Sequence, residues 1–154
     1  SHASEWGIDP QKIGVSGFSA GGHLASTLGT HFDQQSRPNF MILFYPVISL
    51  TEMYTHQGSK INLLGDKSED VNLIKYFSND KQVSTLLLLS DDDKSVPTVN
   101  STLFYNQLKK YSIPASIYIF PSGGHGWGCN KSFKYYNEWQ TLMFDWLSSQ
   151  KLVP

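Results

Sequence analysis

The sequence predicts an α/β fold, in which a mostly parallel sheet of about four strands carries helices on both faces. Two observations lead to this prediction. Short apolar runs with the length of buried strands alternate along the chain with stretches of helical periodicity. Loops rich in glycine or aspartate follow these runs, at the end where parallel strands carry their functional loops. With 154 residues, the chain is expected to form a single domain.

The expected elements follow in chain order. Ser4–Pro10 has the sequence of a helix end, because Gly7 can adopt the left-handed cap conformation and Pro10 blocks continuation. The polar, mixed segment Ser49–Val83 is expected to be a lid or an insertion. The strands are expected at Lys12–Ser16, Asn39–Val47, Ser84–Ser90 and Ala115–Phe120. The helices are expected at Gly21–Thr30, Lys60–Leu64, Glu69–Tyr76, Val96–Tyr111 and Phe133–Leu147.

Composition argues against several classes of function. A formal net charge of −1 offers no surplus of positive charge to nucleic acid or to an acidic membrane surface. The chain has no run of about 18 apolar residues that could span a bilayer. A soluble protein is therefore expected, in a compartment that the sequence leaves open, with secretion and the periplasm included. The single cysteine, Cys129, is expected to be a structural thiol. Trp139 and Trp146 share one helix face and are expected in the core rather than on a sugar-stacking surface.

The stretch Gly17–Gly21 matches the pattern GxSxG between a predicted strand and a predicted helix. So tight a turn is expected to strain the backbone at Ser19, and side chains at Gly17 and Gly21 are expected to collide across it. The Ser19 hydroxyl would then project from the tip of the sheet as a nucleophile. The Ala20 amide would lie at the helix N-terminus, where an oxyanion is stabilised. A glycine-rich helix start used only for packing or for phosphate is the alternative.

A serine nucleophile needs a base, and a base of this kind needs a carboxylate to orient it. His125 follows the last predicted strand and has glycines on both sides. Asp91, Asp92 and Asp93 follow the Ser84–Ser90 strand, and each is a candidate for the acid. The chain order serine, aspartate, histidine is that of the α/β-hydrolases. The remaining histidines have no such position and are expected to be structural: His2, His23, His31 and His56.

These motifs resemble those of the α/β-hydrolase superfamily, in particular its acetyl-xylan-esterase-like branch, which is related to prolyl oligopeptidases and dienelactone hydrolases. The resemblance covers nearly the whole chain. It is carried by GFSAGGHLA at Gly17–Ala25, by DKSVP at Asp93–Pro97 and by GGHGW at Gly123–Trp127. The second motif falls on Asp93, so the resemblance implies that Asp93 is the acid rather than Asp91 or Asp92.

The resemblance implies a hydrolase of carboxylic esters that needs no metal or organic cofactor. Acetyl esters of xylan or of a related carbohydrate are the implied substrates, and Phe18 and Trp127 would wall a small acyl pocket. A serine peptidase of the prolyl oligopeptidase kind is one alternative, and a catalytically inert fragment is another. A dienelactone hydrolase would more often carry cysteine at the position of Ser19.

The chain departs from the family pattern before the Gly17–Gly21 turn, which is called the nucleophile elbow in this superfamily. Family members carry roughly half of the domain there, including an HGG-type loop that donates a second oxyanion N–H. Here 18 residues precede Ser19, so the chain resembles the C-terminal half of a hydrolase. We expect an unpaired sheet edge at Lys12–Ser16 that pairs with a second copy or with a missing N-terminal half. We also expect weak or absent activity in the isolated chain.

Overall fold

The computed structural model describes residues 2–67, 72–78 and 83–153. In this part of the chain, the strands form one parallel sheet in the order β1-β2-β3-β4. The strands are β1 (Val15–Phe18), β2 (Phe40–Phe44), β3 (Ser84–Ser90) and β4 (Ala115–Phe120). The helices are α1 (Ala3–Trp6), α2 (Ala20–His31), α3 (Gln57–Leu64), α4 (Val99–Lys110) and α5 (Tyr136–Ser149), with short 3-10 helices η1 (Pro10–Lys12) and η2 (Leu73–Tyr76).

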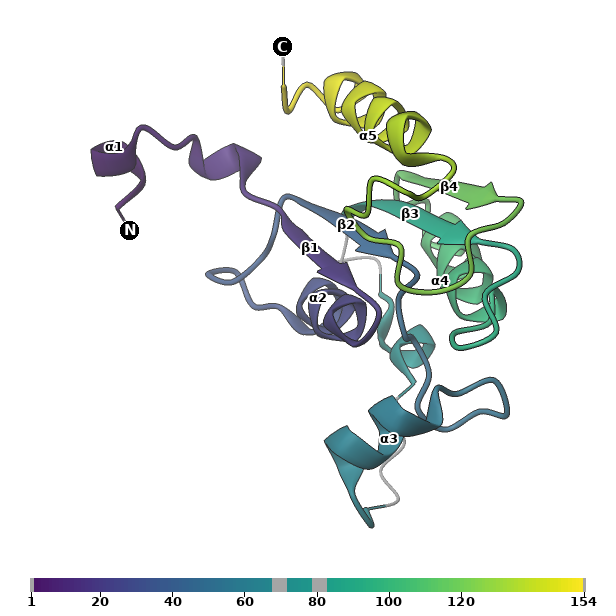
Figure 1. Ribbon diagram of the computed structural model, residues 1–154. Coiled ribbons are helices and arrows are strands. Elements are labelled where there is room, and N and C mark those ends of the chain that lie inside the picture. The colour runs from purple at the N-terminus through teal and green to yellow at the C-terminus, as the bar shows by residue number, and fades with distance from the viewer. Residues whose placement is uncertain (1, 68–71, 79–82, 154) are drawn as a thin grey trace.

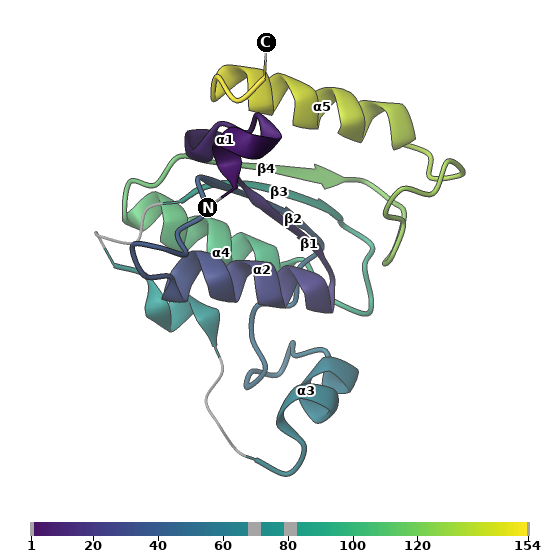
Figure 2. The same cartoon turned by 90° about the vertical axis from the view of Figure 1, so that its left-hand side faces the viewer.

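The helices cover both faces of this sheet. Figure 1 shows the strands side by side, and Figure 2 shows α5 on one face with α2 and α4 on the other. The predicted α/β class with a parallel sheet is therefore confirmed. β3 and β4 have the predicted bounds. Gly7 ends α1 with a φ of 65°, as its position in the sequence predicts.

The first strand lies further along the chain than predicted. The sequence predicts a strand at Lys12–Ser16, but β1 begins at Val15 and η1 occupies Pro10–Lys12. The Asp9 side chain accepts a hydrogen bond from the Gln11 N–H at 2.9 Å, which stabilises this short helical turn. The prediction was wrong here because a local side-chain cap outweighs the apolar pattern.

Several other boundaries also differ. β2 ends at Phe44 rather than Val47, because Tyr45 takes a φ of 36° and leaves the extended conformation. α3 begins before Lys60, because His56 caps it. Of the helix predicted at Glu69–Tyr76, residues 69–71 lie outside the described residues and Leu73–Tyr76 is η2. Both α4 and α5 begin later than predicted.

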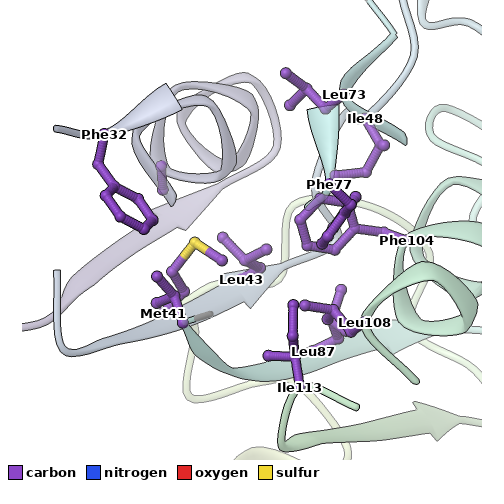
Figure 3. Close-up of a cluster of buried hydrophobic side chains, with 12 residues drawn as sticks. Phe32, Met41, Leu43, Ile48, Leu73, Phe77, Leu87, Phe104, Leu108 and Ile113 are labelled. Carbon is purple, nitrogen blue, oxygen red and sulfur yellow. The ribbon is translucent and has the colours of Figure 1, made fainter. Parts of the chain in front are cut away.

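The core consists of two apolar layers, one on each face of the sheet. Figure 3 shows the layer beneath α2 and α4, a single cluster that contains Met41 and Leu43 of β2, Leu87 of β3 and Phe104 of α4. The opposite layer packs beneath α5 and contains Trp139 and Trp146, which confirms their prediction as core residues. Because both faces of the central strands are buried, their sequences are continuous apolar runs rather than alternating ones.

Two predictions from composition concern the single cysteine and membrane-spanning segments. Cys129 is exposed, so packing in the core does not account for it. Within the described ranges, no helix is long and apolar enough to cross a membrane. The role of Ser49–Val83 as a lid stays a prediction, although α3 within it stands away from the sheet (Figure 1).

Candidate active site

Ser19 joins β1 to α2 in a strained backbone conformation. Its φ of 53° and ψ of −118° lie where residues with a Cβ are rarely found. The surrounding main chain holds this conformation. The Ser19 N–H donates to the Phe44 carbonyl at 3.0 Å, and the Ser19 carbonyl accepts from the Val47 N–H at 3.1 Å. The hydroxyl is thereby fixed at the carboxyl end of the sheet.

The glycines of this turn have different roles from those expected. A Cβ on Gly17 would collide with the carbonyl of Gly21, as predicted. A Cβ on Gly21 itself would meet nothing within 4 Å, so the expected collision at Gly21 is wrong. Gly22 is the second constrained position, because its Cβ would lie 2.7 Å from Cβ of Pro46. Gly17 and Gly22 thus allow α2 to approach β1 and the loop after β2.

The structure brings the predicted serine, histidine and aspartate into one hydrogen-bonded line. Ser19 Oγ lies 2.7 Å from His125 Nε2. His125 Nδ1 lies 2.6 Å from Asp93 Oδ2. A carboxylate can only accept, so Nδ1 carries the proton in this pair and Nε2 of the neutral ring is free to accept from the hydroxyl. This arrangement can activate a serine hydroxyl as a nucleophile.

The three consecutive aspartates after β3 make different contacts. Asp93 is the one that meets His125, and its side chain has no exposed area. Its other oxygen, Oδ1, accepts from the Ser95 and Val96 N–H groups, each at 2.9 Å. Asp92 is exposed and accepts from the Gly124 N–H at 2.7 Å, which lowers the pKa of the Asp92 carboxyl. Asp92 therefore anchors the histidine loop, while Asp91 is exposed.

The loop that carries His125 is also anchored by Tyr45, a residue that no sequence motif indicated. The Tyr45 hydroxyl accepts from the Gly128 N–H at 2.9 Å, and its ring meets the His125 ring edge-on at 4.8 Å between centroids. Burial raises the pKa of the Tyr45 hydroxyl. The phenol therefore stays protonated at neutral pH. The signal in the sequence is weak, since it consists only of an aromatic residue before Pro46 at a strand end.

The Ala20 N–H has the position expected of an oxyanion donor. Ala20 is the first residue of α2, a helix of 12 residues, so no carbonyl within the helix can accept from its N–H. The helix dipole adds positive potential at the same point. The oxyanion that forms when Ser19 Oγ adds to a carbonyl carbon would lie next to this end of the helix.

A comparison with known protein families identifies the group to which the chain belongs. The model of the prolyl oligopeptidase family, Peptidase_S9, matches residues 2–151. The chain belongs to the prolyl oligopeptidase family. The match spans the elbow, the aspartate and the histidine loop together.

Relatives of this prolyl oligopeptidase-family chain include enzymes named for xylan. An acetylxylan esterase of Xylanibacter ruminicola is 39% identical over 96% of the chain, which spans 32% of that protein. Endo-1,4-beta-xylanase B of Butyrivibrio fibrisolvens is 40% identical over 81% of the chain, which spans 22% of that protein. The chain therefore spans about a third or less of these curated relatives.

A solved structure supports the fold of this family member. An acetyl ester-xyloside bifunctional hydrolase from Caldicellulosiruptor lactoaceticus superposes with a TM-score of 0.93 at 39% identity. The match covers 99% of this chain and 62% of that one. The α/β-hydrolase fold expected from the motifs is confirmed.

The two residues predicted to wall an acyl pocket, Phe18 and Trp127, both make packing contacts. Trp127 is buried, donates from Nε1 to Ser90 Oγ at 3.0 Å and stacks on Phe133. Phe18 is partly exposed and stacks on Phe44 at 4.3 Å between ring centroids. A cavity of about 580 Å³ lies instead between α2 and α3, and neither Phe18 nor Trp127 lines it. Its walls include Ala20, His23, Leu24, Leu50, Leu63 and Tyr76.

The other histidines divide into structural ones and one close to the site. His23 is buried, and its Nδ1 lies 3.0 Å from the Val47 carbonyl oxygen. Burial lowers the pKa of His23 below the ordinary value of 6.5. His2 and His31 bond within or beside their own helices. The His56 ring, by contrast, lies 6.5 Å from the His125 ring, with the two planes within 17° of parallel. No sequence pattern indicated this proximity, because His56 follows no strand directly.

Proposed function

We propose that this chain carries the catalytic residues of a serine esterase that removes acetyl groups from xylan or a related carbohydrate. The observation that carries the proposal is the hydrogen-bonded line from Ser19 through His125 to Asp93 at a strained turn between strand and helix. The line has the atoms and the tautomer that acyl transfer by a serine hydroxyl requires.

In the first step, Ser19 Oγ attacks the carbonyl carbon of the ester. The Oγ–C bond forms while the hydroxyl proton moves to His125 Nε2, which lies 2.7 Å away. Asp93 stabilises the resulting imidazolium through Nδ1–H, and the Ala20 N–H stabilises the oxyanion of the tetrahedral intermediate. The bond between carbon and the alcohol oxygen then breaks, and the alcohol leaves with the proton from Nε2.

In the second step, water takes the place of the alcohol. His125 Nε2 removes a proton from the water as its oxygen attacks the acyl carbon. The bond from carbon to Ser19 Oγ then breaks, and Oγ recovers its proton from Nε2. The products are the free acid and the original enzyme, so the cycle needs no co-reactant other than water.

The acetyl-carbohydrate substrate is supported by the relatives. Two proteins about 40% identical to this chain are named for acetylxylan or xylan, and the structural relative is named for an acetyl ester and a xyloside. Fold alone would not support a substrate, because one fold carries many activities. The family name leaves a serine peptidase as the alternative, and the assay below separates the two.

A fluorophosphonate probe tests the nucleophile. We expect one label per chain, located at Ser19 by mass spectrometry, and no label after Ser19→Ala. Ser16→Ala is the matched control, because Ser16 is an exposed serine of β1, the strand that leads into Ser19, whereas the hydroxyl that lies beside His125 Nε2 is that of Ser19. A folded protein that reacts with no probe at Ser19 would contradict the proposal and support the inert alternative.

Turnover tests the substrate class. Acetate release from acetylated xylan should depend on Ser19 and should exceed cleavage of a prolyl p-nitroanilide peptide by the same sample. Faster cleavage of the peptide amide would favour a peptidase. The labelling experiment remains decisive even where turnover is slow, because it needs the nucleophile and base but not a complete carbohydrate site.

A further inference from the structure

The loop between β2 and α3 is tied to the body of the protein by Asn100 of α4. Asn100 is buried, and its Oδ1 accepts from the Ile48 and Ser49 N–H groups at 3.1 and 3.2 Å. Its Nδ2 donates to the Tyr54 carbonyl at 3.3 Å. The Thr55 hydroxyl donates to the Ser49 carbonyl at 3.1 Å, which closes the loop on itself. The backbone that leads into His56 is therefore fixed relative to the sheet.

The His56 ring is oriented by the helix that it caps. Its Nδ1 accepts from the Ser59 N–H at 3.1 Å and lies 2.8 Å from the Ser59 hydroxyl. A backbone N–H can only donate, so Nδ1 must be unprotonated. The neutral His56 ring consequently carries its proton on Nε2, on the edge of the ring that the cap does not use.

The His56 ring lies beside the ring of His125, the proposed catalytic base. The His56 and His125 rings lie 6.5 Å apart between centroids and nearly parallel. The alcohol oxygen of a bound ester has to lie within about 3 Å of His125 Nε2 to receive its proton. A substituent on that alcohol that extends to the side of the His56 ring would therefore come within reach of it.

We propose that His56 is a substrate-contacting residue whose Nε2–H donates a hydrogen bond to an oxygen on the alcohol portion of the ester. The group recognised is a hydroxyl or ether oxygen near the ester oxygen, as found in a partly acetylated sugar. The inference rests on the proposed esterase function and adds a specificity determinant to it. An aryl ester without such an oxygen gains nothing from this donor.

Two substitutions separate the donor role of His56 from its capping role. In His56→Asn, the side-chain oxygen can take the place of Nδ1 and keep the cap, but no donor replaces Nε2–H. In His56→Gln, the amide nitrogen can replace the Nε2 donor, but the cap is lost. Specificity is measured as kcat/KM for a mono-O-acetylated methyl xyloside divided by kcat/KM for p-nitrophenyl acetate.

The donor role predicts that this ratio falls about tenfold in His56→Asn, the loss expected for one hydrogen bond to substrate. It should fall by no more than about threefold in His56→Gln, in which a donor is retained. An unchanged ratio in His56→Asn would overturn the inference. An equal or larger loss in His56→Gln would do the same, since a retained donor would then bring no gain in specificity.

Binding to the Ser19→Ala chain provides a readout that needs no turnover. The acetylated xyloside should shift the imidazole ¹⁵N resonance of His56 Nε2, and p-nitrophenyl acetate should not. Absence of this shift overturns the inference, whatever the activity. A shift in a protein whose wild type shows no Ser19-dependent hydrolysis and no fluorophosphonate label would reject the esterase proposal and leave the binding site in place.

Discussion

Tyr45 has a strained backbone conformation that its residue type does not favour. It is not a glycine, yet its φ is 36°, a conformation that costs on the order of 1–3 kcal/mol and persists only where the surroundings impose it. Its N–H donates to the Leu88 carbonyl at 2.8 Å, so the backbone is held by β3. The side chain then reaches the His125 loop through both its ring and its hydroxyl. Tyr45 is well placed to position the imidazole.

We expect Tyr45→Phe to slow the reaction of Ser19 with a fluorophosphonate by about tenfold, because the Gly128 N–H loses its acceptor and the histidine loop becomes less ordered. The downfield proton resonance of His125 Nδ1–H should broaden in the same variant. Tyr105→Phe, in α4 on the opposite face of the sheet, is the control. Equal labelling rates and an unchanged resonance would leave Tyr45 with a packing role only.

The residues of the site differed in how far the sequence could predict them. Ser19 and His125 are marked by flanking glycines and strand-end positions, and Asp93 by the motif that it begins. Tyr45 and His56 carry no such mark. Their importance arises from where β2 ends and where α3 begins, and those boundaries depend on a positive φ and on a histidine cap that no periodic pattern encodes.

At the scale of elements, two adjacent glycines at the start of α2 differ in how closely they approach the rest of the protein. A Cβ at Gly21 would enter open space, while one at Gly22 would press on Pro46 in the loop after β2. We expect Gly22→Ala to destabilise the fold by about 1–3 kcal/mol, the usual cost of overpacking. Gly21→Ala should be neutral or stabilising by up to about 1 kcal/mol, since alanine favours helix.

Urea unfolding followed by circular dichroism measures this difference between the two variants. Each serves as the control of the other, because both add one methyl group to the first turn of α2. Equal stabilities would mean that Pro46 and its loop move aside without cost. That outcome would contradict a rigid contact between Gly22 in the first turn of α2 and Pro46 in the loop that leads to His56.

Element boundaries were predictable where burial sets them and not where local capping does. β3 and β4 have the expected ends because the apolar run of β3 stops at Ser90 and Asp91, and Pro114 and Pro121 flank β4. β1 is displaced by the Asp9 cap, and α3 is extended by the His56 cap. The parallel direction of the strands, in contrast, follows from the alternation of strands and helices, which local caps do not alter.

At the scale of the whole molecule, one edge of the sheet is flanked by apolar surface. Within the described ranges β1 pairs with β2 alone. The Ser19 N–H donates to the Phe44 carbonyl at the end of β2. Successive residues of a strand direct their N–H and C=O groups to opposite sides. The N–H and C=O groups of Ser16 and Phe18 therefore point away from β2. Ile13 and Leu24, beside this edge, are 48% and 73% exposed. Such an edge offers both hydrogen bonds and apolar area to another strand.

We therefore expect the chain to associate through β1, either with a second copy or with a polypeptide that supplies the adjacent strand. Sedimentation velocity over a wide concentration range should detect self-association in the wild type. Ser16→Pro removes the outward N–H while leaving the bonds from β1 to β2 intact, and should make the chain monomeric. Ser16→Ala keeps that N–H and is the matched control. Association that persists in Ser16→Pro would place the contact elsewhere, for example at β4, the other edge of the described sheet. A wild type that stays monomeric would contradict pairing with a second copy.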